Sequence, residues 1–314
     1  MSPPRIVVFG GTGFLGRRLV PELLRRGFRV TVPSRNRERQ RELFVLPGVE
    51  VVSADVYAAA DLRSLLQGAY AAINLVGILN ERGRSGHGFR RAHVEFTDGL
   101  IAACRASGVR RLLQTSALNA GRGESHYLRT RGQADEHVRD SALDWTIFQP
   151  SVIFGPGDGL FDRFAGLLRL TPALPLARAG ARFAPVYVGD VARAYARALD
   201  DPATFGQRYE IYGPETLSLE EIVRYTARGL GLRRAVVPLP DALGRLQAAL
   251  MDFMPGKPFS TDNFLSLRLD AVGGIDGLYR LGIEKTPIEA VVPRQLGADT
   301  RQSRHDRRRR ARRA

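Results

Sequence analysis

Cysteine and lysine are scarce in this 314-residue sequence. Cys104 is its single cysteine, which excludes an intramolecular disulfide and a metal site built from several cysteines, and which is typical of a reducing compartment. Only Lys257 and Lys285 are lysines, so arginine supplies nearly all of the 47 basic side chains. Codon bias in a GC-rich genome suffices to explain that choice, so the arginine count by itself does not indicate phosphate binding.

Long apolar runs are also missing. The best run, over residues 69–79, contains Asn74 and stops before Glu81, well short of the roughly 18 residues that span a bilayer. The first residues lack the apolar core and the cleavage site of a signal peptide. We therefore expect a cytoplasmic protein that is at most peripheral to the inner face of a membrane.

The formal net charge of +15 is concentrated at the C-terminus. Residues 301–314 hold eight arginines against Asp306 and carry +7, which leaves +8 for the remaining 300 residues. Because residues 297–314 have almost no apolar content, they are predicted to form a disordered basic tail. No aromatic side chain is interleaved with these arginines, so the sequence predicts no specific nucleic-acid partner.

The first half of the chain alternates short apolar runs with longer helical patterns, which is typical of a parallel sheet covered by helices. Strands are expected at residues 5–9, 29–32, 49–52, 71–76, 111–115 and 145–148. Helices are expected at about residues 14–26, 59–67, 90–107 and 127–140. The sequence therefore predicts an α/β fold with a Rossmann-type, doubly wound parallel sheet over residues 1–155.

The pattern changes after Pro150 to shorter elements punctuated by proline. We expect residues 156–296 to form a smaller, mixed α/β domain on the substrate side, and we leave open whether part of it returns to the sheet. Ser218, three residues before Glu221, predicts the capped start of a helix over residues 217–231. A further helical segment, over residues 241–254, carries an apolar stripe that is either core or a membrane or partner contact: Leu243, Leu246, Leu250 and Phe253.

A glycine-rich segment, GGTGFLG, occupies residues 10–16 between the first strand and the first helix. Gly10, Gly13 and Gly16 are spaced three apart, and such a turn lets a pyrophosphate approach backbone N–H groups and the positive end of a helix. We therefore predict that a dinucleotide binds here, with further contacts from Thr12, Phe14 and Leu15. The alternative is a turn that joins strand to helix without a ligand.

The end of the second strand predicts which dinucleotide binds. An acidic residue there binds the ribose 2′-hydroxyl of NAD(H), whereas an arginine accommodates the 2′-phosphate of NADP(H). Ser34 and Arg35 stand at this end and no carboxylate appears before Glu38, so NADP(H) is preferred over NAD(H). The alternative is that Arg35 simply begins a solvated basic helix.

Two further strand ends belong to the same edge of the predicted sheet. Asp55 and Val56 follow the third strand, where the carboxylate either accepts a hydrogen bond from the adenine amino group or caps the next helix. Leu75, Val76 and Gly77 end the fourth strand and place small and apolar backbone beside the adenosine.

Several motifs resemble, in order and spacing, those of the extended and atypical short-chain dehydrogenases/reductases, the NAD-dependent epimerase/dehydratase-like superfamily. They extend over about residues 5–225: GGTGFLG at 10–16, NLVGIL at 74–79, SAL at 116–118, YLRTR at 127–131, PSVIFGP at 150–156 and PVYVGDV at 185–191. Within the superfamily, the likeness is greatest to the nucleotide-binding accessory subunit of respiratory complex I and its bacterial relatives. The resemblance implies that Pro150 and Ile153 also contact the cofactor.

In active members of that superfamily, a tyrosine and a lysine one helical turn later face the nicotinamide, and the cation lowers the pKa of the phenol. Tyr127 matches the tyrosine, but Arg131 stands at the lysine position. Ser116 matches a serine that binds a substrate oxygen. The helix after the fourth strand has Ala92 and His93 where active relatives use an asparagine. Two of the four expected catalytic residues are therefore altered.

The resemblance implies two alternative functions. In the first, NADP(H) is a structural or sensory ligand near quinone metabolism or a respiratory complex, and its binding stabilises the fold. In the second, an NADPH-dependent oxidoreductase uses Tyr127 to protonate an apolar carbonyl or quinone substrate, with charge from Arg131 and orientation from Ser116. No metal site is expected. An apolar substrate pocket is expected from four rings, unless they are core: Phe161, Phe164, Phe183 and Tyr187.

Overall fold

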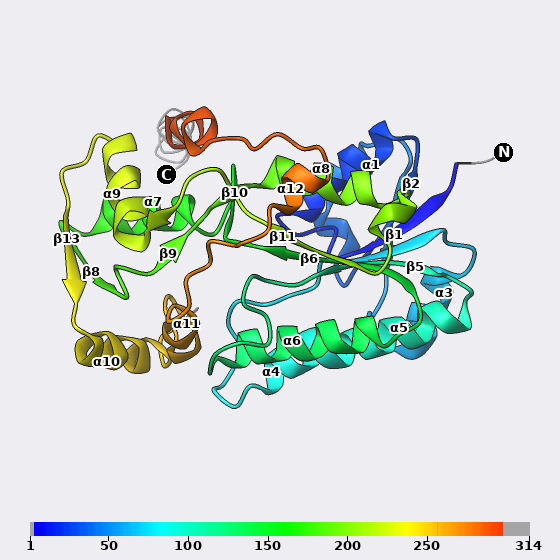
Figure 1. Cartoon of the computed structure of the whole chain (residues 1–314), viewed down its shortest axis with the longest axis horizontal. Coiled ribbons are helices and arrows are strands. Elements are labelled where there is room, and N and C mark those ends of the chain that lie inside the picture. Colours follow the sequence, from blue (N-terminus) through cyan, green and yellow to red (C-terminus); the bar gives the residue numbers. More distant parts are fainter. Residues whose placement is uncertain (1–2, 256, 298–314) are drawn as a thin grey trace, which may run out of the picture.

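A seven-stranded parallel sheet forms the centre of the computed structural model, which describes residues 3–255 and 257–297 (Figure 1). Its strand order is β11-β6-β5-β4-β1-β2-β3, and every neighbouring pair is parallel. The strands are β1 (Arg5–Phe9), β2 (Arg29–Ser34), β3 (Val49–Ser53), β4 (Ala71–Asn74), β5 (Arg111–Thr115), β6 (Asp144–Pro150) and β11 (Gln207–Ile211). The order reverses between β1 and β4, so the predicted α/β, Rossmann-type fold is confirmed. Beyond Gly297, the predicted basic tail lies outside the described residues.

Helices cover both faces of the sheet, which is why its central strands are apolar on both sides. Ile6, Val7 and Val8 of β1 are fully buried. One face packs against α1 (Gly16–Arg25), α8 (Val188–Ala198) and α12 (Gly277–Arg280), and the other against α3 (Ala59–Leu66), α5 (Phe96–Ala106) and α6 (His126–Arg139). The hydrophobic core is therefore divided by the sheet into two layers.

Two elements near the carboxyl ends of the strands differ from the sequence-based expectation. β4 ends at Asn74 rather than Val76, because Asn74 Oδ1 accepts the Val76 N–H at 2.9 Å and turns the chain. The helix predicted over residues 90–107 begins earlier and contains a π-helical turn: α4 (His87–Arg90), η2 (Arg91–Glu95) and α5 follow one another directly. Such π turns often occur at functional sites.

Part of the second half of the chain returns to the sheet. α8 packs on α1, and β11 pairs with β6 as the edge strand. Two short elements connect β2 to β3 in the first half: η1 (Arg37–Arg39) and α2 (Arg41–Phe44). The remaining elements of the second half are β7 (Ile153–Phe154), α7 (Phe161–Leu170), β8 (Ala173–Ala177), β9 (Arg182–Phe183), β10 (Val186–Tyr187), η3 (Pro202–Thr204), β12 (Leu217–Ser218), α9 (Leu219–Gly229), β13 (Ala235–Leu239), α10 (Asp241–Met251), α11 (Thr261–Ser266) and a helix over residues 288–297. β13 pairs with β8 beside α7 and α9, away from the sheet (Figure 1).

Three expectations for this second half have clear outcomes. The capped helix start is confirmed, because Ser218 Oγ accepts the Glu221 N–H at 3.2 Å and the Glu221 carboxylate accepts the Ser218 N–H at 2.7 Å. Of the two alternatives left open for the four rings, core holds for Phe161, which is fully buried in a cluster against which the other three rings pack. The stripe on α10 is exposed and is therefore not core. Within the described ranges, every helix is too short or too polar to cross a membrane.

Candidate functional site

The glycine segment turns between β1 and α1 at the point where the strand order reverses. Gly10 has φ +77°, and a Cβ there would stand 3.0 Å from the carbonyl carbon of Leu75. A Cβ on Gly16 would approach the backbone of Gly11 to 2.4 Å. The loop thus packs against the chain that leaves β4 at Gly10, and the start of α1 packs against the loop at Gly16. Only glycine permits such close approaches at these two positions.

This packing leaves several amides of the loop free to bind a ligand. Gly11 and Gly13 donate their N–H groups to backbone carbonyls at 3.2 and 2.9 Å. The N–H groups of Thr12, Phe14 and Leu15 donate to no acceptor in the part of the chain that the structure describes. Together with the N-terminus of α1, these amides form a positively polarised cradle that fits a pyrophosphate.

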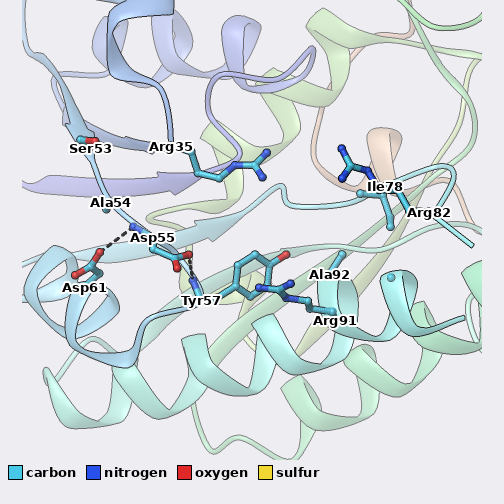
Figure 2. A pocket seen from close by; sticks show the side chains of 11 residues that line it. Arg35, Ser53, Ala54, Asp55, Tyr57, Asp61, Ile78, Arg82, Arg91 and Ala92 are labelled. Atoms are coloured by element: carbon cyan, nitrogen blue, oxygen red, sulfur yellow. Dashed lines mark hydrogen bonds between the residues drawn. The ribbon is translucent and has the colours of Figure 1, made fainter. Parts of the chain in front are cut away.

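A cleft of about 820 Å³ adjoins the ends of β2 and β3 and the turn η2 (Figure 2). It brings together Arg35 and Asp55, two residues that the sequence analysis proposed, with Tyr57, Arg82 and Arg91, which it did not single out. The guanidinium groups of Arg35 and Arg82 point toward one another across this cleft (Figure 2). Neither arginine has a carboxylate partner among the described residues.

The carboxylates of the cleft are held by backbone amides instead. Asp55 Oδ1 accepts the Tyr57 N–H at 3.0 Å, and Asp61 Oδ2 accepts the Asp55 N–H at 2.8 Å. Asp55 does not cap the next helix, because the N-cap residue of α3 is Ala58, so that alternative is wrong. Arg91 stacks on the Tyr57 ring, 4.4 Å from its centroid. The unpaired arginines therefore give the cleft a positive charge that suits an anionic ligand.

Ser34 is buried beside this cleft. Its Oγ accepts the Asn36 N–H at 3.3 Å, which shapes the turn after β2 and leaves the hydroxyl proton available for another acceptor. The other predicted cofactor residues lie on two apolar clusters. Val56 and Val76 pack against the core under α3 and α5. Phe14, Leu75 and Ile153 pack, with Tyr187, against the core under α1 and α8, and Pro150 is buried at the end of β6.

Arg131, which the resemblance matches with the superfamily's lysine, lies on α6, and its side chain is only 5% exposed. Its Nη1 donates to the carbonyl oxygen of Thr115 at 2.8 Å and to that of Val76 at 3.4 Å, and its Nε is buried without a partner. The guanidinium carbon lies 5.6 Å from the centroid of the half-buried Tyr127 ring. Arg131 therefore joins the carboxyl ends of β4 and β5 beside the tyrosine.

Ser116 does not face an open space. Its Oγ donates to Asp135 Oδ2 at 2.7 Å, and Gln149 Nε2 donates to the same oxygen at 3.0 Å. Burial raises the pKa of Asp135 to about 6, although these two hydrogen bonds and the charge of Arg131 favour its ionised form. The hydroxyl proton of Ser116 is thus used within the protein. Asp135 lies eight residues after Tyr127 on the same helix and was not singled out from the sequence.

His93, on the π turn, is buried against the same helix. Its Nδ1 lies 2.9 Å from Thr130 Oγ1, whose own proton goes to the carbonyl oxygen of His126 at 2.8 Å. Nδ1 therefore carries the imidazole proton and Nε2 is an acceptor, toward which the Ile78 N–H points at 3.5 Å.

Burial and the nearby charge of Arg131 lower the pKa of His93 to about 2, so the ring is neutral. Its centroid lies 5.5 Å from that of Tyr127. The sequence analysis noted His93 only within the stretch that the resemblance matches with an asparagine, and its burial beside Tyr127 is what the structure adds. No cluster of metal-binding side chains occurs in the described ranges.

Comparisons with known proteins concern the family and the fold of the chain. Residues 10–202 match a family model described as NAD(P)H-binding. The mitochondrial NADH dehydrogenase (ubiquinone) 1 alpha subcomplex subunit 9 of Arabidopsis thaliana is 31% identical over 277 residues, which are 85% of this chain and 68% of that protein. The ceramide reductase of Caulobacter vibrioides is 29% identical over 251 residues, 79% of this chain and 77% of that protein.

A solved structure shows the same fold. It is a double mutant of DesIV, a dTDP-glucose 4,6-dehydratase from Streptomyces venezuelae with NAD bound. It matches with a TM-score of 0.76 at 21% identity and covers 94% of this chain and 97% of that chain. At this identity, the likeness concerns the fold alone.

Proposed function

Because this chain belongs to the NAD(P)H-binding family, with the fold of the epimerase/dehydratase-like short-chain dehydrogenases, we propose that it binds NADP(H) as a structural or sensory ligand. One observation supports a structural or sensory role for the ligand rather than a catalytic one. Arg131 and Ser116, which match the superfamily's lysine and its substrate-binding serine, bind a strand-end carbonyl and a buried carboxylate instead. A ligand that binds only the folded state then acts by stabilising and ordering that state, without a chemical reaction.

The residues that would hold the cofactor are those of the loop and the positive cleft. The free amides of Thr12, Phe14 and Leu15 suit the diphosphate, and Arg35 with the Ser34 hydroxyl suits the 2′-phosphate. Bound NADPH supplies a hydride at its nicotinamide ring. We further propose that the protein acts beside quinone metabolism at a membrane, in association with a respiratory complex. The mitochondrial complex I relative supports this setting.

The test is a pair of dissociation constants, for NADPH and for NADH. A charge-assisted hydrogen bond contributes about 1.5–3 kcal/mol, so NADPH should bind roughly ten- to a hundredfold more tightly. Arg35→Gln should abolish this preference without weakening NADH binding. Arg39→Gln, at an exposed arginine of the same segment that does not line the cleft, is the matched control and should retain the preference. Equal constants for the two coenzymes in the parent protein would contradict NADP(H) selectivity.

A second function is favoured by the placement of Tyr127. The charge of Arg131 lies beside the phenol ring on the same helix face, and a bacterial relative is a reductase. In this alternative, Tyr127 donates its phenolic proton to the oxygen of an apolar carbonyl or quinone substrate that lies beside its ring. The neutral His93 packs against the tyrosine and holds its ring in place.

A further inference from the structure

The helix α10 presents its large apolar side chains outward. The residues it buries are small: Gly244 and Ala248. A Cβ on Gly244 would stand 3.0 Å from Ala177 Cβ and from the ring of Phe264, so this side of the helix packs closely on the protein. Five large apolar side chains of the same segment are exposed, and we call them the α10 face: Leu243 (51%), Leu246 (55%), Leu250 (63%), Phe253 (78%) and Met254 (49%).

The α10 face is an apolar ridge that follows the helix and the residues directly after it. Leu243, Leu246 and Leu250 follow one another at intervals of three and four, which places them along one side of α10, and Phe253 and Met254 come just after its last residue. The helix lies at one end of the molecule, beside α11 (Figure 1). Monomeric proteins rarely expose contiguous apolar patches of this kind without a partner. A ridge on a single helix is suited to immersion in the boundary between lipid head groups and acyl chains.

The charges around this ridge favour an anionic surface. Its two carboxylates are already paired, Asp241 with Arg178 at 3.0 Å and Asp252 with Arg84 at 3.2 Å. Arg245 and Lys257 have no carboxylate partner in the described part of the chain. Outside the last fourteen residues the sequence still carries +8 of its +15. Long-range attraction to anionic lipids therefore adds to burial of the apolar ridge.

From this arrangement we propose that the α10 face docks on an anionic lipid bilayer. The inference rests on the proposed function only for its setting at a membrane. Docking through α10 would also orient the candidate site, because the neighbouring α11 contacts the start of α6. The Asp262 carboxylate of α11 accepts the N–H groups of His126 and Tyr127 at 2.5 and 3.2 Å. Docking thus brings the helix that carries Tyr127 next to the bilayer, where apolar quinones and long-chain carbonyl compounds are concentrated.

Flotation of the full chain with lipid vesicles tests this proposal. We expect it to float with vesicles of equal parts phosphatidylcholine and phosphatidylglycerol, and less with phosphatidylcholine alone. The variant Leu246→Ser/Leu250→Ser/Phe253→Ser should bind at least about tenfold more weakly, because each buried apolar side chain contributes on the order of 1.5–3 kcal/mol. The matched control replaces two aliphatic residues and one aromatic residue that are exposed elsewhere: Val45→Ser/Ile275→Ser/Tyr279→Ser. It should float like the parent.

Three results would overturn the inference. The parent protein fails to float with either vesicle; the α10 variant floats as well as the control; or the parent is a dimer that only the α10 variant dissociates, which would assign the face to a second copy of the chain. The NADPH-induced rise in melting temperature is measured on all three proteins. If NADPH still raises the melting temperature while flotation fails, membrane docking is wrong and nucleotide binding stands. If the protein floats but NADPH leaves the melting temperature unchanged, nucleotide binding is wrong and docking stands.

Discussion

The guanidinium of Arg131 lies against the Cα of Gly77, so that a Cβ on this glycine would stand 2.0 Å from Arg131 Nη2. Arg131 belongs to α6, and Gly77 follows β4, so this contact joins the helix that carries Tyr127 to the chain beyond the strand. The arginine is not free to withdraw, because it is buried and donates to the Thr115 carbonyl. The absence of a side chain at position 77 therefore makes room for a cation larger than lysine.

We expect Gly77→Ala to lower the free energy of unfolding by about 1–3 kcal/mol, as overpacking in a close-packed region does. Arg131→Lys shortens the side chain and should relieve most of that cost in the double variant, a coupling of about 0.5–3 kcal/mol. Urea unfolding of the four proteins measures both quantities. Strictly additive effects would show that the two positions do not compete for the same space.

The pKa of Asp135 gives a second prediction. Burial raises it from the ordinary 3.8 to about 6, so the folded state binds the proton more tightly than the unfolded chain. Asp135 therefore weakens the fold progressively as pH rises from about 4 to about 6, by a total of roughly 3 kcal/mol. Asp135→Asn is neutral throughout and keeps an oxygen for Ser116 and Gln149. Its stability relative to the parent should therefore increase across this window.

Urea unfolding at intervals from pH 4 to pH 8 measures that difference. Asp140→Asn, at an exposed carboxylate on the C-cap of the same helix, is the control and should run parallel to the parent. A constant difference between Asp135→Asn and the parent at all pH values would mean that Asp135 titrates normally.

His93 predicts the opposite dependence. Burial, with the charge of Arg131, lowers its pKa from 6.5 to about 2, so on acidification the unfolded chain takes up a proton that the folded state does not. Because of this imidazole, the free energy of unfolding decreases as pH falls below about 6.5, by up to about 1.4 kcal/mol per pH unit. His93→Asn retains a donor for Thr130 and should lose stability less steeply between pH 6.5 and 4. His87→Asn, at an exposed histidine, should behave as the parent does.

Turnover separates the two functions. If NADP(H) is a structural or sensory ligand, NADPH oxidation with a short-chain ubiquinone analogue or an alkyl ketone should be as slow in the parent as in Tyr127→Phe. NADPH binding by both proteins, measured by the shift in melting temperature, is the control. A substrate-dependent rate that Tyr127→Phe reduces by about 10²–10⁴-fold, the usual contribution of a general acid, would instead establish the reductase.

The sequence predicted the sheet and the glycine loop because both depend on local pattern. Buried parallel strands are short apolar runs, and the close approaches at Gly10 and Gly16 tolerate only glycine. It did not predict that β4 ends at Asn74, since that turn depends on a side chain hydrogen bond to Val76. The contacts of Arg131 were equally inaccessible, because they join α6 to strands far away in the sequence.

The apolar stripe of α10 shows a different limit. Helical spacing identifies which side chains share a face, but not whether that face is covered. Here the small residues Gly244 and Ala248 fit against Phe264 and Ala177, so the protein packs against the opposite side of the helix from the one that hydrophobicity alone suggests. Burial of this kind is decided by the shape of the neighbouring elements.

The return of the chain to the sheet constrains how the protein can be divided. β11 supplies the last strand beside β6, and α8 covers α1, although both follow residue 155. A fragment that ended there would leave the backbone of β6 unpaired along one edge and the leucines of α1 uncovered. The parallel sheet is therefore completed only when translation has passed well into the second half, so the first 155 residues and the strand that closes their sheet edge depend on one another.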